Sequence, residues 1–294
     1  MRIGDRKLFQ DRAALWGIAF ALPALGYIAL FQLYPILFSF YISLHDYDLL
    51  SEPVYVGFRH FAALPGDRAF MNSLWVTVAY VVYTVVPVLL MSFMMAWALT
   101  LLRRSRGLFQ TLLFFPSVMP IVSVALVWKL MFNFNGPVND VASLVAGGPL
   151  PWLNNSTYAP AALIIMSWWH AASYYMIIFL AGFLAIPRDL YEAAELDGAR
   201  GFQTLRYITL PSMKPTIVLA VVLATVNGLK TFAFQKIVTD GGPAGATEIL
   251  TLLIYRTSFS YLDMGRASAY SVVLFGGILL ISLAQLWFLR ERNG

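Results

Sequence analysis

The sequence predicts an all-α protein that crosses a membrane six times. Hydrophobic residue types make up 60% of its 294 residues and charged types only 12%, whereas an ordinary soluble domain carries about a quarter charged residues. Six mostly apolar runs are each long enough for a membrane-spanning helix, which needs about 20 such residues. The low charge and the long runs together exclude an ordinary soluble fold.

The six runs follow one another with short connections between them. Prolines lie inside the first three runs, and prolines in spanning helices are tolerated where neighbouring helices satisfy the freed backbone groups. The pattern therefore indicates a packed bundle rather than separate spans. The runs are residues 13–44, 74–102, 108–132, 159–186, 213–234 and 267–289.

The basic residues predict the orientation of the chain. Thirteen of the 20 Lys and Arg residues lie in the N-terminal segment, the turn at 103–106, the loop at 187–214 and the tail. Because cytoplasmic connections carry the excess of Lys and Arg, we expect segment 1–12, loop 187–214 and tail 290–294 to be cytoplasmic. Residues 13–289 then form the transmembrane domain. The net charge of +5 follows from this topology and requires no nucleic-acid partner.

The sequence also argues against chemistry carried by the chain itself. There are no cysteines, so disulfides and thiolate metal sites are excluded. The spans hold no carboxylate pair and no His-rich cluster, so a membrane-embedded enzyme is the weaker hypothesis. Too little chain lies outside the spans for a nucleotide-binding domain. We expect no metal or cofactor on this chain and an energy source on a partner or in an ion gradient.

The loop "IPRDLYEAAELDGARGFQTLRYITLP", residues 186–211, is unusually charged and alanine-rich. Pro187 suits the first position of a helix, and Asp189 and Glu192 then favour its positive end. Glycines at 198 and 201 are typical of a helix end. Helices that lie on lipid usually carry Lys and Arg with large apolar residues. The neutral, alanine-rich composition instead favours a helix–turn–helix that docks on a protein.

Two spans carry polar residues at helical spacing. Polar groups at membrane depth indicate function by default, although Ser, Thr and His also hydrogen-bond between helices as structural contacts. We expect the two stripes to face a common aqueous cavity. They are Ser167, His170 and Tyr174 in the fourth run and Asn227, Lys230 and Thr231 in the fifth.

Several motifs resemble those of one transporter family. "EAAELDGA" (192–199), followed by "YITLP" (207–211), resembles the EAA motif of the inner-membrane permeases of bacterial ABC importers. Further segments are similar to the carbohydrate-uptake branch, whose members import maltose and glycerol phosphate. These are "FFPSVMP" (114–120), "VWKLMFN" (127–133), "LAGFLAIPRDLYEAA" (180–194), "TDGGP" (239–243) and "GRASAYSVVLF" (265–275).

The resemblance implies a type I ABC importer permease fold, with coupling helices between the fourth and fifth spans. Such helices insert into a cleft on a cytoplasmic ATPase, which holds the ATP and Mg. The coupling residues carried over are Glu192, Ala193, Gly198 and Ala199. The implied partners are two ATPase copies, a periplasmic or lipid-anchored binding protein and a second, homologous permease, with a homodimer as the alternative. The implied location is the bacterial inner membrane.

The resemblance also implies a substrate pathway. It carries over Ser117, Ser167, His170, Tyr174, Gly228 and Thr231, and the chemistry of Asn227 and Lys230 adds these two. The implied solute is a di- or oligosaccharide, a polyol, or an acidic or phosphorylated sugar; the alternative is an amino acid, a peptide or an oxyanion. Lys230 departs from the family pattern. We expect it to pair with an anionic substrate group or, alternatively, to form a salt bridge to the partner permease.

Overall fold

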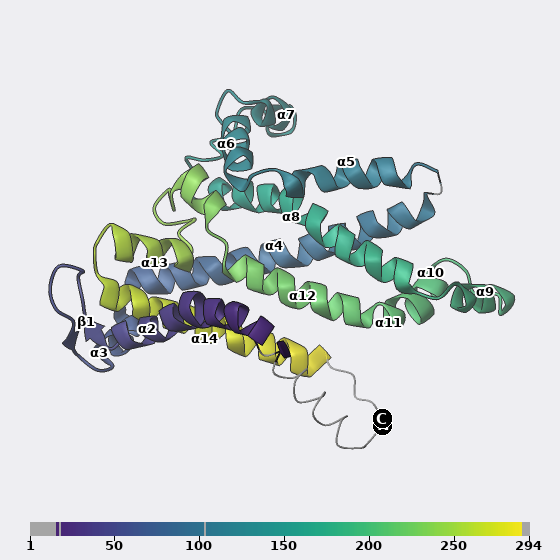
Figure 1. Ribbon diagram of the computed structural model, residues 1–294. Coiled ribbons are helices and arrows are strands. Elements are labelled where there is room, and N and C mark those ends of the chain that lie inside the picture. The colour runs from purple at the N-terminus through teal and green to yellow at the C-terminus, as the bar shows by residue number, and fades with distance from the viewer. Residues whose placement is uncertain (1–15, 18, 103, 290–294) are drawn as a thin grey trace, which may run out of the picture. The chain divides into compact units, whose positions relative to one another are not determined.

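The computed structural model describes residues 16–17, 19–102 and 104–289, and this part of the chain is mostly helical (Figure 1). The predicted terminal segments 1–12 and 290–294, and the start of the first apolar run, lie outside the described residues. Four described helices are long and apolar enough to span a membrane, or six if two bent helix pairs each count as one span. The prediction of an all-α membrane fold is confirmed.

The helices and strands follow one another in a simple order. A short antiparallel hairpin pairs β1 (His45–Asp46) with β2 (Val54–Tyr55). The first spanning helix is Ala19–Ile42, which ends in α2 (Tyr34–Ile42). The others are α3 (Arg59–Ala63), α4 (Arg68–Leu101), α5 (Arg106–Val118), α6 (Ile121–Met131), α7 (Pro137–Ala146), α8 (Tyr158–Ala185), α9 (Arg188–Leu196), α10 (Phe202–Thr204), α11 (Leu210–Ser212), α12 (Lys214–Leu229), α13 (Leu250–Phe259) and α14 (Met264–Leu289).

The third predicted run, residues 108–132, is not one helix. α5 and α6 are bent by 91° at the two residues between them, Met119 and Pro120. Proline lacks the backbone N–H that a continuing helix needs, and Pro120 lies directly before α6 as its N-cap residue. The third run is therefore a bent helix pair, which counts as one of the six predicted spans if both halves cross the membrane together.

The fifth predicted run, residues 213–234, is also broken. α12 ends at Leu229, and a short non-helical stretch separates it from a second helical segment that ends at Thr239. The carbonyl groups at a helix end need new partners, and the Thr251 hydroxyl donates to the Thr231 carbonyl within this stretch. The break places non-helical backbone inside the predicted span.

The described chain divides into two compact units. Unit 1 contains the described residues up to Leu64 together with Thr257–Val273, and unit 2 contains Pro65–Arg256 and the described residues from Leu274 onward. Within unit 1, the Met264 N–H donates to the Tyr47 carbonyl at 2.9 Å. His60 Nε2 lies 3.0 Å from the His45 carbonyl oxygen. The hairpin is thereby attached to the start of α14.

Gly265 allows this close attachment, and we expect Gly265→Ala to destabilise the protein by about 1–3 kcal/mol, the usual cost of overpacking. A β-carbon at this position would overlap the His45 carbonyl oxygen and lie 2.7 Å from His60 Nε2. Gly276→Ala on the same helix is the control, because its added carbon meets nothing within 4 Å. Thermal unfolding in detergent measures both variants, and equal midpoints would contradict the argument.

Unit 2 is held together by close contacts between α4, α8 and α12. Ser92 Oγ of α4 lies 2.9 Å from the Ala172 carbonyl oxygen of α8. A β-carbon added at Gly182 of α8 would lie 2.8 Å from the Thr216 side chain of α12. Small residues at such contacts let membrane helices approach closely. The three helices consequently form the frame that positions the cavity described below.

The two ends of unit 2 differ in character. Figure 1 shows α9 and α10 at the end where α4 finishes and α5 begins, with α6 and α7 at the opposite end. The turn after α4 carries three Lys or Arg residues, and the loop that contains α9 carries four. Their location at one end agrees with the predicted distribution of basic loops.

Two helices outside the six predicted runs were not predicted. α7 begins with Pro137 at its first position and ends at Gly147, whose φ of 74° is left-handed. Proline at the start and glycine just past the end are typical helix boundaries. α13, which follows the "TDGGP" turn, was likewise not predicted.

Candidate functional site

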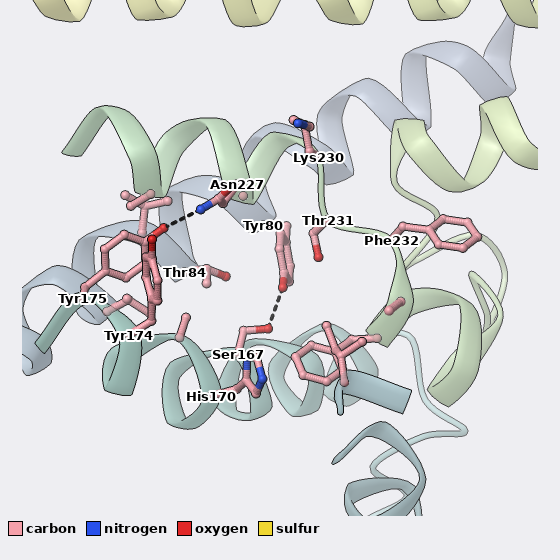
Figure 2. Close-up of a pocket in the computed structure, with 18 residues that line it drawn as sticks. Tyr80, Thr84, Ser167, His170, Tyr174, Tyr175, Asn227, Lys230, Thr231 and Phe232 are labelled. Carbon is pink, nitrogen blue, oxygen red and sulfur yellow. Dashed lines mark hydrogen bonds between the residues drawn. The ribbon is translucent and has the colours of Figure 1, made fainter. Parts of the chain in front are cut away.

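A cavity of about 440 Å³ lies in unit 2 between α4, α8 and the end of α12 (Figure 2). Its walls come from residues far apart in the sequence, with Tyr80 on α4, Ser167 on α8 and Asn227 on α12. Seven of the eight predicted pathway residues line it. These are Ser167, His170, Tyr174, Asn227, Gly228, Lys230 and Thr231.

The break after α12 gives the cavity its shape. Residues 230–234 all line it. The first three of them, up to Phe232, are not helical, and the helix resumes at Ala233. Irregular backbone at membrane depth is tolerated only where it is covered by protein or lines an aqueous cavity. Thr231 therefore reaches the cavity from a non-helical stretch rather than from the helical face that the sequence predicted.

Two hydrogen bonds connect the walls. The Tyr80 hydroxyl lies 2.5 Å from Ser167 Oγ, which in turn donates to the Leu163 carbonyl at 2.7 Å. Because the serine hydroxyl has one proton, Tyr80 is the donor to Ser167. Asn227 Nδ2 donates to the Tyr175 hydroxyl at 3.0 Å. The cavity thus presents hydroxyl and amide groups from all three helices.

The wall formed by α4 was missed in the sequence. Tyr80 and Thr84 both line the cavity (Figure 2), and both side chains are buried. The Thr84 hydroxyl is directed into the space between α8 and α12. These two residues add polar groups to the predicted stripes on the other two walls.

Lys230 lies at the rim of this arrangement. It is the residue directly after α12, and its side chain is exposed. Its ammonium group has no hydrogen-bond or ion-pair partner among the described residues. Figure 2 shows its ammonium group on the side away from Ser167 and His170. The cation is thus available to a group outside this chain.

Ser117 is not brought together with the other predicted pathway residues. It is absent from the cavity lining, and its hydroxyl donates to the Phe114 carbonyl at 2.8 Å. The 91° bend that follows α5 redirects the chain. Ile121, the first residue of α6, lines the cavity instead.

The predicted coupling residues lie on and just after α9. Glu192, Ala193 and Gly198 are exposed, and Ala199 is half-buried. The opposite side of the helix is fixed to unit 2 because Ala194 is buried and the Tyr191 hydroxyl lies 3.2 Å from Thr209 Oγ1. α9 therefore presents a carboxylate and small side chains to solvent on a supported helix.

The end of α9 explains why Gly198 is a glycine. Its φ is 81°, in the left-handed region. The Gly198 N–H donates to the Glu195 carbonyl at 3.1 Å and the Ala199 N–H donates to the Ala194 carbonyl at 2.9 Å. This pair of bonds is the Schellman motif, which usually requires glycine at its left-handed position. The turn between α9 and α10 is therefore sharply defined.

Ion pairs order the loop between α12 and α13. Arg256 pairs with Glu248 and also donates to the Asp240 carbonyl. The hydrogen bond from Lys236, at 2.9 Å, lowers the pKa of Asp240. Burial opposes the charge of Arg256, but Glu248 and Asp240 hold its pKa above the ordinary value. Residues 239–243 thus form an ordered turn.

A bundle of apolar helices that lines an open cavity with several polar groups and carries a supported charged helix at one end is typical of a membrane transport permease. The chain belongs to the family described as "Binding-protein-dependent transport system inner membrane component", which matches residues 89–293. It is thus the multi-pass permease subunit of such a system, and the predicted family is confirmed.

The relatives agree with this assignment over nearly the whole chain. The chain is 32% identical to the trehalose/maltose transport system permease protein MalF of Thermococcus litoralis, over 96% of each chain. It is 30% identical to the sulfoquinovosyl glycerol transport system permease protein SmoG of Agrobacterium fabrum, over 99% of this chain and 93% of the relative. A chain from the crystal structure of a bacterial ABC transporter involved in import of the acidic polysaccharide alginate shares its fold, with a TM-score of 0.84 at 22% identity over 98% of this chain and 100% of the other.

Proposed function

We propose that this chain forms half of the translocation pathway of an ATP-driven ABC importer for a sugar or sugar derivative. The observation that carries the proposal is the cavity, which presents Tyr80, Ser167, Asn227 and Thr231 beside the aromatic ring of Tyr174. Sugars need several hydrogen-bonding groups and a flat apolar surface, and binding cavities commonly combine the two. The two relatives are named as permeases for trehalose/maltose and for sulfoquinovosyl glycerol, and these names support a sugar over an amino acid or peptide.

The partners are those of a complete importer. Half a pathway requires a second permease, which we propose is homologous but not identical, together with two ATPase copies and a binding protein. Glu192, Ala193, Gly198 and Ala199 contact the ATPase, since the exposed side of α9 is small and acidic. The complex lies in the bacterial inner membrane with both termini of this chain in the cytoplasm.

The solute class is tested with the binding protein that functions with this chain. Its retained solute is identified by mass spectrometry, and uptake of that solute is measured in vesicles that contain the whole importer. Retention and ATP-dependent uptake of a sugar or sugar derivative are expected. Retention of an amino acid, a peptide or an inorganic oxyanion would contradict the proposal.

Lys230 bears on whether the sugar is charged. We expect Lys230→Ala to reduce uptake of an acidic sugar at least about tenfold, the effect of losing one charged hydrogen bond, while a neutral sugar is little affected. The exposed, unpaired ammonium at the cavity rim supports this role. Lys129→Ala is the matched control, because Lys129 also lies in a predicted span but donates to the Ile237 carbonyl at 3.0 Å. Equal losses for both sugars would instead favour a salt bridge to the partner permease.

A further inference from the structure

α4 carries a buried hydroxyl group that the proposed pathway has not yet used. The Thr84 side chain is only 6% exposed, and its Oγ1 has no hydrogen-bond partner among the described residues. Threonine and serine within helices commonly donate to the carbonyl four residues earlier. Thr77 and Ser92 of the same helix do so, each at 2.6 Å. Thr84 Oγ1 and Ser73 Oγ are the hydroxyl oxygens of α4 that are buried without a partner among the described residues, and of the two only Thr84 lines the cavity.

A second unpaired atom faces the same cavity from another helix. His170 Nε2 of α8 is buried and likewise has no hydrogen-bond partner among the described residues. Thr84 and His170 both line the cavity. More than about 90% of buried polar groups in proteins have a partner. Of the five buried polar atoms without a partner among the described residues, these two line the cavity, where a bound molecule can reach them.

We propose that Thr84 and His170 each hydrogen-bond to the transported sugar, so that α4 forms a substrate-binding wall. A sugar hydroxyl both donates and accepts, so it can pair with a threonine hydroxyl or with an imidazole nitrogen. Figure 2 shows the Thr84 hydroxyl directed into the cavity between Asn227 and Ser167, which supply further polar groups. This inference rests on the proposed sugar transport and adds a specificity-determining pair to it.

Uptake by the assembled importer tests the pair with matched variants. Thr84→Val keeps the shape and removes the hydroxyl, and Thr84→Ser keeps the hydroxyl. We expect Thr84→Val to raise the KM for the sugar up to about tenfold, the effect of one lost hydrogen bond, and Thr84→Ser to restore it. Thr100→Val is the control on α4, because the Thr100 hydroxyl bonds to the Trp97 carbonyl away from the cavity.

Singly deoxygenated sugars identify the hydroxyl that is bound. The unmodified importer should transport one deoxy analogue poorly. Thr84→Val should transport that same analogue at the same rate as the unmodified importer, because the analogue and the variant each remove the same contact. If Thr84→Val discriminates among all analogues as the unmodified importer does, the pair binds water alone and the inference is wrong. Failure of the unmodified importer to transport any sugar would contradict the proposed function itself.

A labelling experiment keeps the inference testable if Thr84→Val assembles poorly. The chain contains no cysteine, so Thr84→Cys introduces its single thiol. Saturating sugar should slow maleimide labelling of this thiol in the assembled importer. Labelling of Thr100→Cys should be unchanged by the sugar. Equal labelling of Thr84→Cys with and without sugar would overturn the inference.

Discussion

We expect Gly198→Asp to abolish ATP-driven uptake while the chain still inserts into the membrane. A left-handed backbone disfavours residues with a β-carbon, aspartate less than most, and Gly198 has a φ of 81° within the turn that ends α9. A carboxylate at a helix C-terminus also opposes the helix dipole. The substitution therefore distorts and recharges the exposed segment that we propose contacts the ATPase. Uptake in vesicles and co-purification of the ATPase measure the effect.

Gly147→Asp separates this effect from local strain. Gly147 also ends a helix, has a φ of 74° and has open space around its missing β-carbon. Figure 1 shows its helix, α7, at the end of unit 2 opposite α9. The control should retain uptake and ATPase attachment. Normal uptake by Gly198→Asp, or equal losses in the two variants, would contradict a docking role for α9.

The long helices could be predicted because hydrophobicity alone determines them. α4, α8 and α14 agree with the predicted runs to within a few residues at most ends. The largest difference is at the start of α4, where Asp67 accepts hydrogen bonds from the N–H groups of Ala69 and Phe70 and begins the helix early. Asp67 is a typical N-cap residue, so this boundary was present in the sequence.

The broken spans could not be predicted from hydrophobicity, which continues through each break. Pro120 marks the bend between α5 and α6, but Pro87 lies inside the uninterrupted α4. The same residue type thus has opposite outcomes, and tertiary contacts decide between them. After α12, the deciding contact comes from Thr251, a residue 20 positions beyond Thr231. Such distant partners are not evident from local sequence.

The α4 wall of the cavity carried a signal that was overlooked. Thr77, Tyr80 and Thr84 stand at the same i, i+3, i+7 spacing as Ser167, His170 and Tyr174 on α8. The spacing places them on one helical face, and the structure directs Tyr80 and Thr84 into the cavity. Thr77 faces a different partner, the backbone N–H of Leu250. Spacing finds the face, but packing decides which members reach the cavity.

Filling the cavity should stop transport without uncoupling the ATPase. Ala171 of α8 lines the cavity and is only half-buried, so we expect Ala171→Trp to place an indole in the 440 Å³ space that the substrate would occupy. Uptake should fall to the level measured without ATP, because close-packed walls leave a bulky ring no other place. ATP hydrolysis stimulated by the binding protein should persist, since α9 is unchanged.

Ala181→Trp provides the comparison on the same helix. Ala181 is exposed and lines none of the cavities described, so its variant should transport at a near-normal rate. Normal uptake by Ala171→Trp would show that the cavity is not on the pathway, and losses in both variants would assign the defect to the packing of α8. Ala171→Trp is expected to retain ATP hydrolysis and lose uptake, whereas Gly198→Asp is expected to lose both. These two results would place solute passage and energy coupling at separate parts of one helical frame.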